Sequence, residues 1–124
     1  MMDEPLPAEL REFLAQHIDS IAQLEALLLL RGVPDIVWDV ESIARRLYID
    51  EQQASQVLAQ LCAEGLVEAE AGTFRFRPQS GELLRMAALL DDHYRRYLIA
   101  ITNLIHAKPR RIQQFADAFK LKKD

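Results

Sequence analysis

The pattern of apolar positions predicts a helix at the centre of the chain, over residues 50–65. Asp50 stands where an N-cap accepts a backbone hydrogen bond, Gln53 follows three positions on, and Gly65 stands where helices end in a left-handed residue. Between them the apolar side chains recur at spacings of three, one and three: Ala54, Val57, Leu58 and Leu61. This stripe predicts one face in the core and an outer face that is small and rich in amides.

A shorter helix is predicted directly before it, over residues 40–47. Asp39 is its candidate N-cap. Its inward side chains repeat the same spacing: Val40, Ile43, Ala44 and Leu47. Only Tyr48 and Ile49 separate this helix from Asp50, so the two helices must cross steeply, as in a helix-turn-helix.

After the second helix the apolar period changes to alternation, which predicts two short strands over residues 66–70 and 73–77. Pro78 ends the second strand. A two-residue Ala-Gly turn between the strands would place Glu68 opposite Arg75, where the two charges neutralise each other. Two phenylalanines fall on one face of the hairpin and two arginines on the other: Phe74 and Phe76, Arg75 and Arg77.

This order of short helix, tight turn, second helix and β-hairpin resembles the winged helix-turn-helix of bacterial transcriptional regulators such as the MarR type. The residues that carry the resemblance cover about a third of the chain: 40–47, Ala54, Leu58, Leu61, 65–67 and 74–78. The resemblance implies a mainly α fold with a small β-wing in a single winged-helix domain. It also implies a DNA-binding transcriptional regulator.

Two further helices are predicted upstream, over residues 7–17 and 20–31. The first has one stripe of inward positions: Leu10, Phe13, Leu14 and His17. The second follows the candidate N-cap Ser20 and has leucines on more than one face, so we expect it to lie at the centre of the fold. Residues 35–38 are predicted to add a strand to the hairpin, because two strands alone are marginal.

The last predicted helix is long, over residues 80–107, and Ser80 is its candidate N-cap. Its apolar positions form a heptad seam with alternating intervals of four and three: Leu83, Ala87, Leu90, Tyr94, Tyr97, Ile101 and Leu104. The seam predicts a homodimer with these interface residues: Leu83, Leu90, Tyr94, Tyr97, Ile101 and Leu104. Alternatively, the helix over residues 10–17 and the Phe-Ala-Asp-Ala-Phe segment near the C-terminus cover the seam within one chain.

The 124 residues are enough for one domain with a substantial core. Its expected parts are the N-terminal helices (7–38), the helix-turn-helix and wing (39–78), a long dimerisation-type helix (79–107) and a basic amphipathic tail (108–124). The longest apolar run, residues 26–30, is far too short to span a bilayer, and the N-terminus is acidic where a signal peptide is basic. We therefore expect a soluble cytoplasmic protein with no membrane association.

No motif in the chain predicts catalysis. The three histidines are far apart and lack a metal-binding spacing: His17, His93 and His106. Cys62 is the only cysteine, and its place near a helix C-terminus beside Glu64 is expected to raise its thiol pKa. This favours an idle thiol over a redox sensor. We expect no enzyme activity, no cofactor and no metal.

Polar side chains of the helix-turn-helix and wing are the candidate DNA contacts, because glutamine pairs bidentately with adenine and arginine binds phosphate. The candidates are Arg45, Arg46, Gln52, Gln53, Ser55, Gln56, Gln60, Arg75 and Arg77. Charge opposes this interpretation, since residues 39–78 carry seven carboxylates and four arginines, and the helix over 50–65 has no lysine or arginine. The alternatives are a non-catalytic protein-interaction module with a protein partner, and a solvated face with no ligand.

Overall fold

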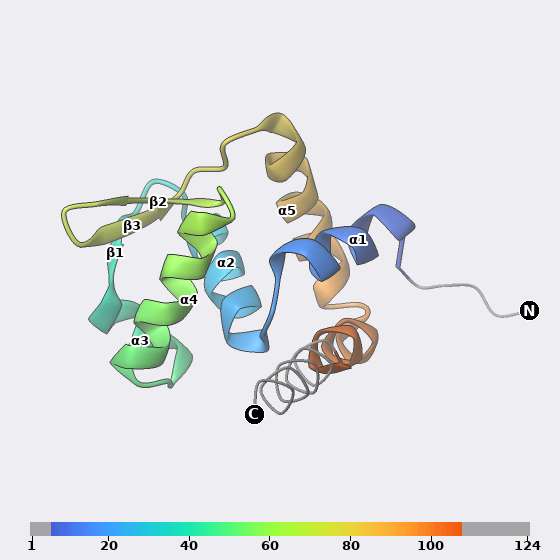
Figure 1. Cartoon of the computed structure of the whole chain (residues 1–124), viewed down its shortest axis with the longest axis horizontal. Coiled ribbons are helices and arrows are strands. Elements are labelled where there is room, and N and C mark those ends of the chain that lie inside the picture. The colour runs from blue at the N-terminus through green and yellow to red at the C-terminus, as the bar shows by residue number, and fades with distance from the viewer. Residues whose placement is uncertain (1–5, 108–124) are drawn as a thin grey trace, which may run out of the picture.

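The computed structural model describes residues 6–107, and its elements confirm the predicted mainly helical fold with a small sheet. They follow in the order α1 (Ala8–His17), α2 (Ile21–Gly32), β1 (Trp38–Asp39), α3 (Val40–Leu47), α4 (Glu51–Ala63), β2 (Val67–Glu70), β3 (Thr73–Phe76) and α5 (Gly81–Tyr94). One more helix, here called the last described helix, covers Leu98–Ala107. In Figure 1 the sheet, α3 and α4 lie on one side of α2, and α1, α5 and the last described helix lie on the other.

The central position predicted for α2 is confirmed, because α2 packs against α3, α4, α5 and β3. Ser20 caps it by accepting a hydrogen bond from the Gln23 amide. The Gln23 side chain is itself buried, and it donates to the His17 carbonyl at 2.7 Å and accepts from the Asp19 amide at 2.8 Å. These bonds fix the corner between α1 and α2. No single helix within residues 6–107 is long and apolar enough to cross a membrane, although α1 and α2, bent by 108° where they meet, would pass that test as a pair.

The helix-turn-helix forms where the capping residues predict it. Asp39 caps α3 by accepting from the Ser42 amide at 2.8 Å, and Asp50 caps α4 by accepting from the Gln53 amide at 2.7 Å. The buried residues of the two helices are those of the predicted stripes: Ile43, Ala44, Ala54, Val57, Leu58 and Leu61. Tyr48 turns the chain between the helices in the left-handed conformation, at φ 58° and ψ 43°.

The wing is a three-stranded antiparallel sheet in the order β1-β3-β2. Ala71 and Gly72 form the predicted two-residue turn, both with positive φ, as a primed hairpin turn requires. The first strand forms as predicted but only at Trp38–Asp39, so the predicted bounds of 35–38 are wrong. Its late start follows from a turn before it, in which the Ile36 amide bonds to the Val33 carbonyl at 3.0 Å.

The prediction of one uninterrupted helix over residues 80–107 is wrong. The helix ends at Tyr94, and a second helix begins at Leu98, which makes six helices within the described residues where five were predicted. In Figure 1 the last described helix lies at a clear angle to α5. The bend brings Ile101 and Ile105 into the buried core, at 0% and 1% exposure. Burial of these two side chains therefore outweighs continuity of the helix. The predicted basic tail lies outside the described residues.

Candidate nucleic-acid interface

The outer face of α4 carries the amides that the sequence predicts there. Its inner face is fully packed, since Ala54, Leu58 and Leu61 are completely buried. The five candidate base-reading side chains are all exposed: Gln52, Gln53, Ser55, Gln56 and Gln60. The structure thus brings these five residues together on one accessible face of a helix, which is the arrangement that major-groove recognition uses.

The wing is fixed relative to α4 by the segment that follows β3. Gly65 ends α4 with φ +79°, and its carbonyl accepts a hydrogen bond from the Gln79 amide at 2.8 Å. The Arg77 amide donates to the Leu66 carbonyl at 3.1 Å. Because these bonds join both ends of the hairpin to the end of α4, the amide face and the wing form one rigid unit.

Each of the four candidate phosphate-binding arginines already has a partner. Arg75 Nε lies 3.1 Å from Glu68 Oε1, in the register that the sequence predicts, and Arg77 Nη1 lies 3.7 Å from the same oxygen. On α3, Arg45 Nη1 lies 3.4 Å from Oε2 of Glu41, four residues earlier. Because Arg75 and Arg77 share the single carboxylate of Glu68, these pairs neutralise only part of the positive charge of the wing.

Arg46 is the fourth arginine, and its partner is an aromatic ring. Its guanidinium carbon lies 5.6 Å from the ring centroid of Trp38 in β1. An exposed ion pair is worth only about 0–1 kcal/mol, and an exposed cation–π contact about 0.5–1 kcal/mol. Phosphate groups are strong enough to replace such partners. The pairing would therefore weaken a contact with phosphate without preventing it.

Two residues of this unit were not singled out from the sequence. Tyr48 has 94% of its surface exposed beside the start of α4. At the other end of the helix, Glu64 Oε1 lies 2.5 Å from Nδ1 of His17 in α1. The exposure of Tyr48 could have been predicted from its position in the two-residue turn before Asp50. No local signal predicts the second contact, because 47 residues separate its partners.

The remaining candidates for chemistry have structural partners. Burial raises the pKa of the Cys62 thiol, in the predicted direction but through desolvation where the prediction invoked the helix dipole and Glu64. Nδ1 of His93 contacts the Leu89 carbonyl at 2.9 Å. Within residues 6–107 no three His, Cys, Asp or Glu side chains are grouped so as to hold a metal ion.

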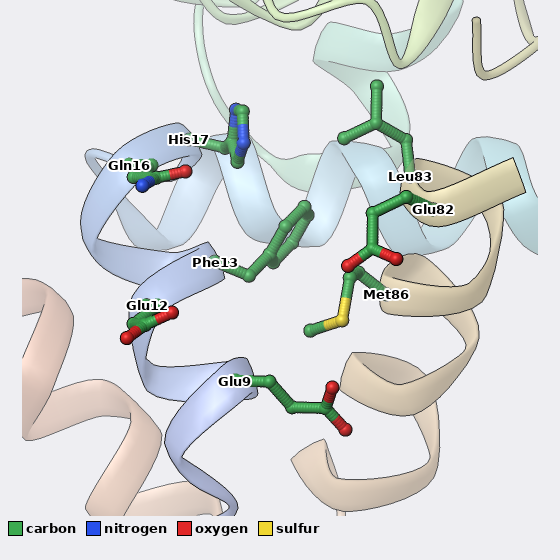
Figure 2. Close-up of a pocket in the computed structure, with 8 residues that line it drawn as sticks. All are labelled: Glu9, Glu12, Phe13, Gln16, His17, Glu82, Leu83 and Met86. Atoms are coloured by element: carbon green, nitrogen blue, oxygen red, sulfur yellow. The ribbon is translucent and has the colours of Figure 1, made fainter. Parts of the chain in front are cut away.

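A cleft between α1 and α5 is shown in Figure 2, where Phe13 and Met86 point toward one another. Its volume is about 120 Å³, and it is lined by Glu9, Glu12, Phe13, Gln16, His17, Glu82, Leu83 and Met86. Arg85 binds two of the carboxylates, at 3.0 Å from Glu9 and 3.2 Å from Glu82, and holds the pKa of Glu9 below its usual range. The cleft is much smaller than typical ligand sites of roughly 300–1,000 Å³, so we assign no ligand to it.

The helix-turn-helix, followed directly by a hairpin that pairs with β1, defines a winged-helix protein. The sequence matches no protein-family model and no curated protein. Among solved structures, the chain is similar to wild-type Lactococcus lactis ZitR, a MarR-family winged-helix regulator. The two are 17% identical, with a TM-score of 0.49 over 83% of this chain and 75% of that chain. At this level of similarity the match says nothing about what the present chain binds.

Proposed function

We propose that this chain is a DNA-binding transcriptional regulator of the winged-helix type that acts in the bacterial cytoplasm. The observation that carries the proposal is the exposed amide face of α4, held rigidly beside the wing. In this mode α4 enters the major groove, and Gln52, Ser55 and Gln56 near its N-terminus meet base edges.

The arginines fit the expected positions for backbone contacts. Arg45 and Arg46 are exposed on α3, the helix that crosses the DNA backbone in this docking geometry, and Arg75 and Arg77 lie on the wing. Each must exchange Glu41, Glu68 or the Trp38 ring for a phosphate, so we expect affinity at the weak end for a specific regulator. The binding must also overcome the excess of carboxylates in residues 39–78.

A second candidate is a protein-interaction module that binds no DNA. The specific observation in its favour is that Arg45, Arg75 and Arg77 all contact carboxylates, Arg45 that of Glu41 and the other two that of Glu68, so part of the positive charge that would meet DNA is already neutralised. A basic protein partner would suit this acidic surface without breaking any of these pairs.

A homodimer remains part of the proposal, with its interface revised. Leu90 and Ile101 of the heptad seam are fully buried within the chain, so they cannot be interface residues in this structure. The last described helix has three exposed large apolar side chains, of which Leu104 belongs to that seam and Leu98 and Ile99 do not. Two-fold pairing through this face would present two copies of α4 to a palindromic site.

Selection of genomic DNA fragments at physiological salt tests the proposed function. We expect enrichment of a common sequence. The Gln56→Ala variant should relax the choice of sequence, whereas Gln16→Ala, which removes an exposed glutamine from α1, should leave it unchanged. Arg46→Ala should weaken binding to every sequence and reduce the salt slope by about 0.9, and Arg95→Ala at the end of α5 is its control.

The selection also separates the two candidate functions. If the parent chain binds no fragment above the non-specific level even at about 50 mM salt, where phosphate contacts are strongest, DNA binding is wrong. In that case a protein partner becomes the favoured function.

A further inference from the structure

Tyr48 combines two features that a purely structural residue would avoid. It adopts φ 58° and ψ 43°, a left-handed conformation that costs a non-glycine residue stability and that glycine fills freely. Turns of helix-turn-helix units often contain glycine for this reason. At the same time 94% of Tyr48 is exposed, so its ring gains almost nothing from burial.

The turn itself does not need a tyrosine. The backbone amides of Tyr48 and Ile49 both donate to the Ala44 carbonyl, and any residue except proline can make the first of these bonds at position 48. The side chain of Ile49, by contrast, packs against the core. Conformational strain and exposure together indicate that the Tyr48 ring acts by contacting another molecule.

The position of Tyr48 identifies the surface involved. It stands two residues before Asp50, the N-cap of α4, which is within about 7.6 Å along the backbone. The exposed amides Gln52 and Gln53 follow in the first turn of the helix. An aromatic side chain with a terminal hydroxyl thus projects from the same end of α4 that the proposed function directs into the major groove.

We propose that Tyr48 is a DNA-contact residue whose phenolic hydroxyl donates a hydrogen bond to a backbone phosphate beside the recognition helix. The inference depends on the proposed function. The pairing of the arginines supports the inference, since Arg45, Arg75 and Arg77 must each leave a carboxylate before they bind phosphate. A neutral donor needs no such exchange, and tyrosine is one of the side chains that bind phosphate oxygens and so fix the register of the protein on DNA. A protein partner would use the same exposed ring through packing and would not depend on phosphate.

The test compares Tyr48→Phe, Tyr48→Gly and a matched control, Ala71→Gly. Ala71 in the wing turn is the other non-glycine residue with positive φ in the described chain, at 53°, so its replacement relieves similar strain without removing an aromatic ring. The measurements are affinity for a selected fragment at several salt concentrations, and the urea midpoint of each variant.

We expect Tyr48→Phe to lower affinity by roughly ten- to a hundredfold, which is the range for one hydrogen bond to a charged group, with the salt slope unchanged because no cation is lost. Tyr48→Gly should bind as weakly or more weakly while its urea midpoint rises. Ala71→Gly should raise the midpoint, which measures the relief of backbone strain without the loss of a ring. If Tyr48→Gly is more stable than the parent and binds DNA less well, the ring contributes to binding.

Three results would overturn the inference. If the parent binds DNA and both Tyr48 variants bind equally well, Tyr48 makes no contact and only this inference fails. If the parent binds no DNA, the proposed function fails, and the Tyr48 variants are not needed to show it. A loss of affinity in Tyr48→Gly but not in Tyr48→Phe would assign the contact to the ring and refute the phosphate bond.

Discussion

Gly65 connects α4 to the wing in a conformation that other residues rarely adopt. Its φ is +79°, and a Cβ at this position would lie 2.9 Å from Gln79 Oε1 and 3.4 Å from Leu83 Cδ1. The steric clash of such a Cβ would cost little, because Gln79 Oε1 lies at the end of a flexible side chain that can move. Backbone conformation is therefore the main reason that glycine stands here.

The Gly65→Ala variant should lose about 1–2 kcal/mol of stability, the usual cost of a left-handed L residue. Gly81→Ala is the matched control, since Gly81 begins α5 and a Cβ there would meet nothing within 4 Å. We expect the control to change stability by no more than about 0.5 kcal/mol. Urea denaturation of both variants is the measurement, and equal stabilities would show that the junction tolerates a side chain.

Cys62 should react slowly in the native chain. Burial raises the pKa of its thiol, which reduces the reactive thiolate at a given pH. Alkylation by iodoacetamide near pH 8 should therefore be slower in the native protein than in the same chain unfolded in urea, and the rate should increase as pH rises. A native rate equal to the unfolded rate would reopen the possibility of a redox role.

At the scale of elements, helix starts were the most predictable features. Four side-chain oxygens accept bonds from amides three residues later, and all four positions were predicted from sequence: Ser20, Asp39, Asp50 and Ser80. A cap can be predicted because donor and acceptor are three residues apart, so no knowledge of the tertiary fold is required.

The cap of α3 should make stability depend on acid. Bonds from the Ser42 hydroxyl, at 2.6 Å, and from the Ser42 amide lower the pKa of Asp39. A carboxyl whose pKa is lower in the folded chain stabilises the fold at pH values above its unfolded pKa of about 3.9. This contribution disappears as the pH falls through the folded pKa. Urea midpoints at pH 6 and pH 2.5 should therefore differ less in Asp39→Asn than in the parent, because asparagine caps without titrating.

Ser42→Ala provides an independent comparison for the same cap. It removes the largest cause of the lowered pKa and leaves the carboxyl in place, so its loss of stability on acidification should also be smaller than that of the parent. If both variants lose as much stability as the parent, the acid sensitivity arises at other carboxyls, such as Glu9 beside Arg85.

The helix break after Tyr94 was not predictable from local sequence. No glycine or proline stands between Gly81 and Ala107, and the heptad spacing continues through the break. What decides it is the burial of Ile101 and Ile105 against distant parts of the chain. A periodic pattern predicts which side chains are buried, but it does not predict which surface they pack against.

The partners of the candidate DNA-binding residues were predictable to different degrees. The contact between Glu68 and Arg75 follows from hairpin register and was predicted. The ion pair of Arg45 with the residue four positions earlier had a readable helical spacing that was not used. The contact between Arg46 and Trp38 depends on how α3 lies against the sheet, so only the tertiary structure reveals it.

At the scale of the molecule, α2 separates two regions with different surfaces. The helix-turn-helix and wing carry the exposed amides and paired arginines described above. The opposite side, formed by α1, α5 and the last described helix, carries the most exposed large aliphatic side chain of the described residues, Ile99 at 75%, with Leu98 at 49%, although Ile36 and Val37 before β1 are also 48% and 52% exposed. This division suits a protein that binds DNA on one side and pairs with a second copy on the other.

The proposed homodimer should depend on the exposed apolar face of the last described helix. Replacing Leu98 and Ile99 together by Glu should yield a monomer in sedimentation, because two charges would be desolvated at the interface. Its fold should be nearly as stable as that of a parent monomer, since both positions are exposed in the single chain.

Ile101→Glu distinguishes an interface from a core. Ile101 lies within the same helix but is fully buried, so a carboxylate there should destabilise the chain itself by about 3 kcal/mol or more. Ile101→Glu should therefore destabilise the chain whether or not it dimerises, and only the substitutions at Leu98 and Ile99 report on the interface. If the parent sediments as a monomer at every concentration, the dimer proposal is wrong. A single chain would then bring one copy of α4 to DNA, and a selected site should lack two-fold symmetry.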